Sequence, residues 1–172
     1  PRRGLRVLWL ALLCGAASVG AEVQVRAGDI VAPDFITDTV VDGGAGQAVS
    51  ITACRNGTFS GKVVVGSKDP IEHLAVTVSN LKGTAGSILS SNVQIRYGLV
   101  WGACSVHVPD PTGATGGTLV RKPGLLDLLV QTPPEVFPLQ KDPSGRAEYG
   151  PVVPVWLTVK VPEETPAGTY SG

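Results

Sequence analysis

The sequence predicts an all-β fold, an antiparallel β-sandwich of the immunoglobulin-like or jelly-roll type. Segments in which apolar residues alternate with polar ones recur along the chain, and residues 93–101 form the longest of them. Turn-forming sequences separate these segments, and 22 Gly and 14 Pro among 172 residues favour turns over long helices. No window shows an apolar stripe with helical spacing. Many short strands divided by turns are typical of a sandwich.

The clearest strand predictions come from period-two alternation. Residues 22–27 and 59–65 each place valines on one face, and residues 93–101 keep the pattern longest. Residues 74–78 alternate in the same way and are expected to form a semi-buried strand. Residues 155–161 form the last complete strand of the prediction.

Other segments are less regular. A glycine-rich turn at residues 42–47 is expected to lead into a strand at 48–53. Residues 108–124 have no periodicity and are predicted to be a long surface loop or an insertion, and residues 131–151 are irregular. Residues 125–129 fit either a short helical turn or a buried strand.

Residues 1–21 have the pattern of a secretory signal peptide. Three arginines at positions 2, 3 and 6 precede a short apolar run, and small residues follow up to Ala21. The apolar run is shorter than the ~20 residues that a membrane-spanning helix needs. We therefore expect no membrane span, a mature domain comprising residues 22–172, and a protein that is secreted, periplasmic or held at the cell surface.

The C-terminal residues predict a truncated domain. The strand at 155–161 is followed by a turn, and a second strand begins at Tyr170, two residues before the sequence stops. In a hairpin the second strand runs back along the first, so a strand cut near its start leaves an unpaired edge. We therefore expect low stability for the isolated piece and a missing downstream domain.

Composition and motifs argue against several classes of activity. The formal net charge is zero, and no basic block suggests a nucleic acid partner. Neither His73 nor His107 lies near a nucleophile motif, and no residue spacing predicts a metal site or another cofactor. Asp34 and Asp38 follow a proline in a stretch typical of turn capping rather than acid–base chemistry. The sequence therefore predicts no catalytic residue.

Cys54 and Cys104 remain after removal of the leader. In an oxidising compartment they can form a disulfide, which would stabilise the fold by about 4 kcal/mol in the chain-entropy model. The alternative is two free thiols that behave as small apolar residues. Sequence alone does not place the two Cα atoms within bridging distance, so both alternatives stay open.

Trp156 is the candidate ligand-binding residue. Strand alternation points its side chain away from the face that carries Val155 and Leu157. An exposed ring at this position can stack on a glycan, whereas a ring covered by a neighbouring layer is part of the packing. The sequence leaves these two alternatives open.

Two blocks of the sequence resemble the N-terminal β-sandwich of glycoside hydrolase family 123-like bacterial secreted proteins. The strand at residues 93–97 is also similar to one in that family, so the resemblance extends over most of the mature chain. The two blocks are Ala53-Cys54-Arg55-Asn56-Gly57-Thr58-Phe59-Ser60-Gly61-Lys62-Val63-Val64-Val65 with Leu74-Ala75-Val76-Thr77-Val78-Ser79-Asn80-Leu81, and Pro154-Val155-Trp156-Leu157-Thr158-Val159-Lys160-Val161-Pro162 with Pro166-Ala167-Gly168-Thr169-Tyr170-Ser171-Gly172.

The resemblance implies a non-catalytic accessory domain in front of a (β/α)-barrel in the same chain. In the family that barrel carries an Asp-Glu pair and hydrolyses N-acetylgalactosaminide linkages, with the substrate's acetamido group as nucleophile. No catalytic residue carries over to this sequence, while Arg55, Asn56, Trp156 and Tyr170 receive a structural role in the sandwich and its contact with the barrel. The alternative function is a carbohydrate- or protein-binding module of a cell-surface protein without enzymatic activity.

Overall fold

The computed structural model of the chain describes residues 22–38, 48–108, 118–141 and 144–172. The predicted leader, residues 1–21, and the predicted turn at 42–47 lie outside these ranges. The described part is all-β, its strands pair antiparallel, and its only helical element is the 3-10 turn η1 (Ser90–Asn92). The predicted fold class is therefore confirmed. Across the same ranges, no helix has the length and apolar character that crossing a membrane requires.

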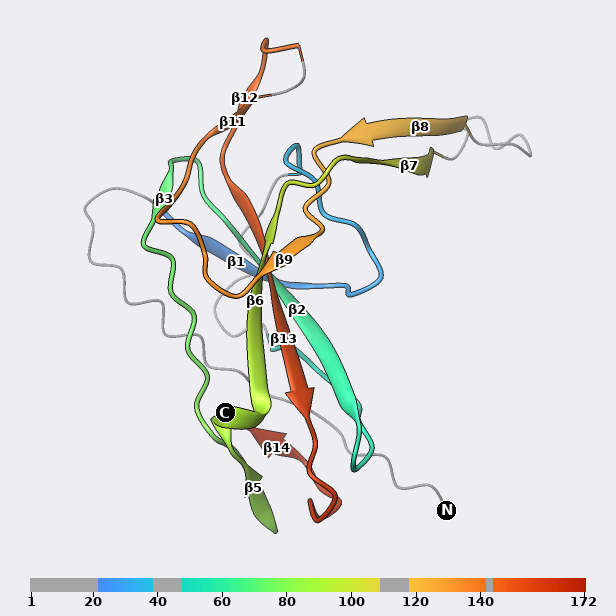
Figure 1. Cartoon of the computed structure of the whole chain (residues 1–172), viewed down its shortest axis with the longest axis vertical. Coiled ribbons are helices and arrows are strands. Elements are labelled where there is room, and N and C mark those ends of the chain that lie inside the picture. The colour runs from blue at the N-terminus through green and yellow to red at the C-terminus, as the bar shows by residue number, and fades with distance from the viewer. Residues whose placement is uncertain (1–21, 39–47, 109–117, 142–143) are drawn as a thin grey trace.

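The main sheet has five antiparallel strands in the order β1–β2–β13–β6–β9. The long strands β2, β13 and β6 run side by side at its centre (Figure 1). The bounds are β1 (Gln24–Gly28), β2 (Thr58–Gly66), β6 (Val93–Leu99), β9 (Leu128–Val130) and β13 (Val152–Lys160). The strands predicted from the cleanest alternation correspond to β1, β2, β6 and β13. Of residues 125–129, only Leu128 and Leu129 lie in a strand, the short and partly exposed β9, while Leu125 forms an isolated bridge with Phe35.

The remaining strands form sheets of two or three strands. Three of these small sheets combine β3 with β10, β11 with β12, and β14 with β4 and β5, and a fourth pairs β7 with β8. The bounds are β3 (Ile71–Glu72), β4 (Leu81–Gly83), β5 (Gly86–Ile88), β7 (Ala103–Val108), β8 (Thr118–Pro123), β10 (Val136–Phe137), β11 (Gln140–Lys141), β12 (Glu148–Tyr149) and β14 (Tyr170–Ser171).

The hydrophobic core lies between one face of the main sheet and a second layer of small strands and connecting chain. Side chains from both layers meet in one cluster, as expected when two β layers pack face to face. The main sheet contributes Val63, Val65, Tyr97, Val153, Val155 and Leu157, and the second layer contributes Val49, Ile71, Leu74, Val76 and Phe137. A second cluster, which includes Leu81, Val161 and Tyr170, closes the end of the sandwich near β14.

Residues 74–78 bury alternate side chains without forming a strand. Leu74 and Val76 are buried, and the residues that follow each of them are exposed. The Val76 N–H donates to the Tyr97 hydroxyl at 3.1 Å, so a side chain takes the place of a neighbouring strand. Residues 48–52, also predicted to lie in a strand, are likewise outside one. Alternation predicts which side chains are buried, but it does not identify the group that accepts each backbone hydrogen bond.

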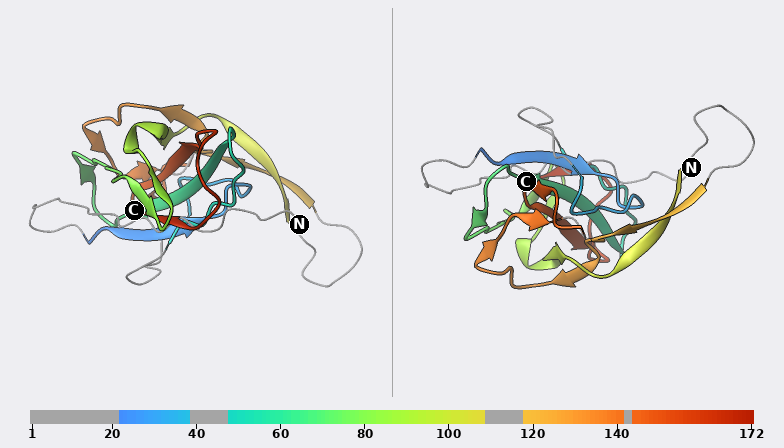
Figure 2. Two further views of the ribbon diagram at one scale, coloured as in Figure 1. Left: turned by 90° about the horizontal axis from the view of Figure 1, so that it is seen from below. Right: turned by 90° about the horizontal axis from the view of Figure 1, so that it is seen from above.

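The predicted surface loop at 108–124 is wrong in part, because it contains strand β8. This strand pairs with β7 from Ala103 opposite Pro123 to Val108 opposite Thr118. The two strands form a ribbon outside the main sheet, and in both end views they reach out to one side (Figure 2). The neighbouring residues Leu119 and Val120 are both exposed. None of the ribbon side chains that the structure describes is fully buried, so alternation of apolar and polar residues has no burial to match there, which explains the missing periodicity.

The final strand does not return along β13 as the predicted hairpin required. Instead β14 pairs with β4, with Tyr170 opposite Gly83 and Ser171 opposite Lys82. The preceding turn therefore carries the chain from the main sheet to the second layer. The Tyr170 hydroxyl donates to the Pro166 carbonyl at 2.9 Å and fastens that turn. The prediction of an unpaired hairpin edge was wrong, since both residues of β14 pair with residues of β4.

Candidate functional site: a pocket beside a buried ion pair

The face of the main sheet opposite the core carries charged and aromatic side chains. Strand register places Trp156 opposite Lys62 on β2 and opposite Arg96 on β6. Directly opposed residues share a face of the sheet, so these three side chains are neighbours. Arg26 lies on the same face, because it is opposite Val64, which is two residues from Lys62. The Lys62 Nζ atom is 5.4 Å from the centre of the Trp156 ring, within the range of a cation–π interaction.

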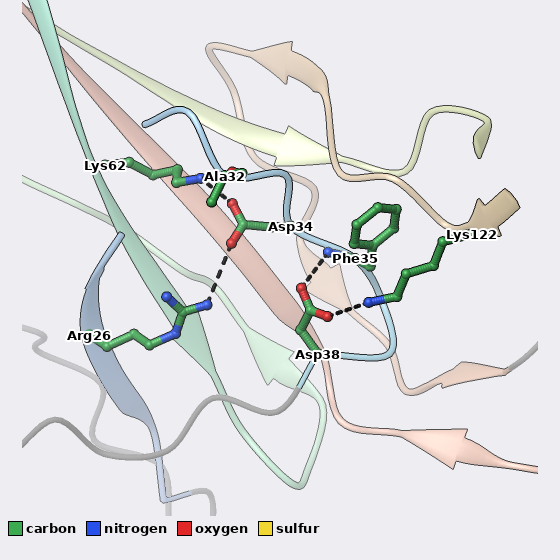
Figure 3. Close-up of polar contacts among 7 residues, drawn as sticks. All are labelled: Arg26, Ala32, Asp34, Phe35, Asp38, Lys62 and Lys122. Atoms are coloured by element: carbon green, nitrogen blue, oxygen red, sulfur yellow. Dashed lines mark hydrogen bonds and ion pairs between the residues drawn. The ribbon is translucent and has the colours of Figure 1, made fainter. Parts of the chain in front are cut away.

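Residues 29–38 cross over this face and supply the partner of Lys62. The Lys62 Nζ donates to Asp34 Oδ2 at 2.5 Å and to the Ala32 carbonyl at 2.8 Å (Figure 3). The Arg26 Nη2 atom lies 3.5 Å from the other oxygen of Asp34. Lys62 is 1% exposed and Asp34 is 7% exposed, so this is a buried ion pair. Burial of two charges is tolerated here because each meets an opposite charge or a hydrogen-bond partner.

A second ion pair joins the same segment to the ribbon. The Lys122 Nζ donates to Asp38 Oδ1 at 2.7 Å and lies 4.1 Å from the centre of the Phe35 ring. The Phe35 N–H donates to Asp38 Oδ2 at 2.8 Å, which caps the turn between the two residues (Figure 3). Residues 29–38 are thus attached to the main sheet through Asp34 and to the ribbon through Asp38.

The turn-capping prediction is right for Asp38 and wrong for Asp34. Asp38 caps the turn that begins at Phe35. Asp34 is instead the buried partner of Lys62, which is 28 residues away in sequence. Sequence reasoning missed this pair, because Lys62 sits among valines and only strand register reveals which carboxylate it meets.

A pocket of about 370 Å³ opens beside the buried ion pair. Its walls include Trp156, Lys62 and Asp34 together with Cys104, Leu125 and Asp127. Small-molecule sites in proteins occupy cavities of this order, mostly apolar with a few polar groups. Trp156, the predicted ligand-binding residue, therefore lines a pocket, although its ring is partly covered.

The groups in this pocket do not form a hydrolytic pair. Asp34 and Asp127 both line it. However, Lys62 and Arg26 occupy the two oxygens of Asp34, so this carboxylate is not free to attack a bond or to transfer a proton. Two carboxylates that cleave a glycosidic bond must both face it. Within the ranges that the structure describes, no group of three or more His, Cys, Asp or Glu residues could hold a metal ion.

The predicted disulfide alternative is not realised, because Cys54 and Cys104 are both free thiols. Cys54 follows Ala53, which packs in the cluster on the core side of the main sheet. Cys104 lines the pocket on the opposite face, with Trp156. Cys54 itself is exposed just before the turn that leads into β2, whereas Cys104 lies on β7.

The remaining predicted residues are not brought together at the pocket. Arg55 and Asn56 are exposed in the turn before β2, where Asn56 has a φ of 55°. Asparagine tolerates this left-handed conformation, which is typical of a tight turn. Tyr170 is buried in the cluster at the end of the sandwich. Among these residues, only Trp156 lies at the pocket.

Comparison with known proteins identifies the family. The family described as "Glycoside hydrolase 123 N-terminal domain" matches residues 38–172. A solved family 123 glycoside hydrolase from Clostridium perfringens, studied for glycolipid glycan hydrolysis, has a similar fold, with a TM-score of 0.51 at 14% identity. That similarity covers 86% of this chain and 23% of the solved chain. No curated protein matches the sequence. The chain belongs to the glycoside hydrolase 123 N-terminal domain family, as the resemblance in its two sequence blocks indicated.

Proposed function

We propose that this chain is the non-catalytic accessory sandwich at the front of a secreted glycoside hydrolase. The catalytic domain would lie further along the same polypeptide and act on N-acetylgalactosaminide linkages. The observation that carries the proposal is the match of residues 38–172 to a family defined as the N-terminal domain of these hydrolases. The solved enzyme of similar fold supports it, because the region of similar fold is only 23% of that protein's length.

The chemistry of the pocket supports a non-catalytic role. The carboxylate of Asp34 is held by Lys62 and Arg26, and the remaining carboxylate, Asp127, has no second free acid beside it in the pocket lining. The ion pairs fix residues 29–38 between the main sheet and the ribbon. Such an arrangement stabilises a scaffold, whereas acid–base catalysis needs groups that reach a substrate.

The reading frame beyond Gly172 provides a first test. We expect it to continue into a region of alternating strands and helices with an adjacent Asp and Glu at a strand end, as the family resemblance implies. Translation of the source DNA shows the downstream sequence, and a structure of the complete polypeptide shows whether it folds into these strands and helices. A stop codon soon after Gly172, or further sandwich repeats, would contradict the accessory role.

A glycan-binding module is the second candidate, because Trp156 lines the pocket with Asp34 and Asp127. Aromatic rings beside polar groups are suited to a sugar. Titration of the full polypeptide with an N-acetylgalactosamine oligosaccharide distinguishes the two candidates. Saturable binding that is lost in Trp156→Ala and kept in Leu89→Ala, which truncates an exposed residue next to η1 and outside the pocket lining, would favour the module.

A further inference from the structure

Exposed apolar side chains gather where the ribbon and residues 29–38 meet. Val31 is 82% exposed, Trp101 is 65% exposed, Ile30 is 46% exposed and Val120 is 45% exposed. Single exposed apolar residues are ordinary in soluble proteins, but a group of them around one pocket marks an interaction surface. We call these four residues the apolar rim.

Two residues of the rim line the pocket, and a third is bonded to its wall through the backbone. Ile30 and Val31 line the pocket together with Leu125. The Trp101 N–H donates to the Leu125 carbonyl at 2.6 Å, which sets Trp101 beside the same wall. Two elements of chain thus bring Ile30 and Val31 to the pocket and fix the backbone of Trp101 next to its wall.

The ribbon supplies the fourth residue of the rim. Cys104, another pocket residue, is opposite Lys122 on β8. Val120 lies two residues from Lys122 and therefore on the same face of the strand. The side chain of Lys122 reaches Asp38, so this face of the ribbon is turned toward residues 29–38. Val120 extends the apolar rim outward along that face.

The pairing and exposure of the ribbon indicate that another surface packs against it. β7 and β8 pair with each other and join no larger sheet. Two-stranded hairpins are marginally stable alone in water. The ribbon is tied to residues 29–38 at its base by Lys122, but Leu119 and Val120 further along remain exposed. A surface that packs against these side chains would stabilise the ribbon by burying them.

We infer that the apolar rim is the surface on which the catalytic domain of the same polypeptide packs. This inference rests on the proposed function. The partner is chosen on two grounds. The family match describes an N-terminal domain, and in the solved enzyme most of the chain lies outside the region of similar fold. Domains of one chain commonly bury 600–1,500 Å² against each other. A lasting contact of this kind is served by apolar side chains, which are costly to leave in water.

Site-directed photocrosslinking in the full-length polypeptide tests the inference. The photoreactive residue p-benzoylphenylalanine is placed at position 31, at position 120, or at position 89 as a control. Leu89 is also exposed, at 53%, but it adjoins η1 at the other end of β6. After irradiation, peptide mapping identifies the partner segments. We expect positions 31 and 120 to crosslink to peptides beyond Gly172, and position 89 to give none.

Three results would overturn the inference. One is the absence of crosslinks beyond Gly172 from positions 31 and 120. Another is equal crosslinking from position 89. The third is crosslinking of positions 31 and 120 to residues 22–172 of a second molecule, which mixing of isotope-labelled and unlabelled chains detects. An assay of N-acetylgalactosaminide hydrolysis on the same polypeptide separates the two proposals: crosslinks without hydrolysis contradict only the proposed function, and hydrolysis without crosslinks contradicts only the interface.

Discussion

Replacement of Lys62 with methionine is expected to lower the free energy of unfolding by about 3 kcal/mol. Lys62 is almost fully buried, and its Nζ atom bonds both Asp34 and the Ala32 carbonyl. The change leaves the buried Asp34 carboxylate with only Arg26, at 3.5 Å. Loss of one member of a buried ion pair is costly, because the remaining charge has given up water without full compensation. Urea unfolding followed by tryptophan fluorescence measures the effect.

A double variant and a surface control make this prediction specific. Lys62→Met combined with Asp34→Leu removes both charges, and we expect it to recover most of the lost stability. Lys160→Met removes an exposed lysine from the end of β13 and is expected to change stability by less than about 0.5 kcal/mol. If Lys62→Met were no more harmful than Lys160→Met, the ion pair would not hold residues 29–38 in place.

Leu157→Ala is expected to cost about 3 kcal/mol of unfolding free energy. Leu157 is fully buried on the central strand β13 and belongs to the cluster that joins the two layers of the sandwich. The truncation removes apolar contacts and leaves a cavity that rigid neighbouring strands cannot fill. Leu89→Ala, at an exposed position, is the matched control and should stay within about 0.5 kcal/mol. Equal effects of the two variants in urea unfolding would contradict the assignment of the core.

The central strands were predictable because their sequence reports burial directly. In β13, Val153, Val155 and Leu157 face the core, while Trp156 faces the other side. A half-buried strand cannot keep this arrangement without period-two alternation, so the pattern and the structure agree. The same reasoning applies to β2 and β6, whose side chains pack beside those of β13.

Pairing between distant segments could not be predicted in the same way. Pro166 and Gly168 indicate a turn before Tyr170, but they do not determine which strand the chain meets next. The structure places β14 beside β4, in a different sheet from β13. Likewise, Val76 is buried as expected, yet its N–H is satisfied by the Tyr97 hydroxyl. Such partners depend on tertiary packing and not on local pattern.

The pocket was only partly predictable. Alternation placed Trp156 on the face away from the core, and the structure confirms that face and adds the pocket. Prediction of the Lys62–Asp34 pair would have required knowing that residues 29–38 cross β2. No local feature marks Lys62 as buried, because one lysine in a valine-rich strand is also what an exposed face would contain.

Hydrolysis by the full-length polypeptide is the most direct test of the accessory role. The substrate is an aryl N-acetylgalactosaminide, and the variants are Asp127→Asn and the double variant Lys62→Met/Asp34→Leu, which remove the two pocket carboxylates. We predict that the parent protein hydrolyses the substrate and that both variants keep its kcat and KM. A folded parent without activity, or a folded variant that has lost activity, would contradict the account.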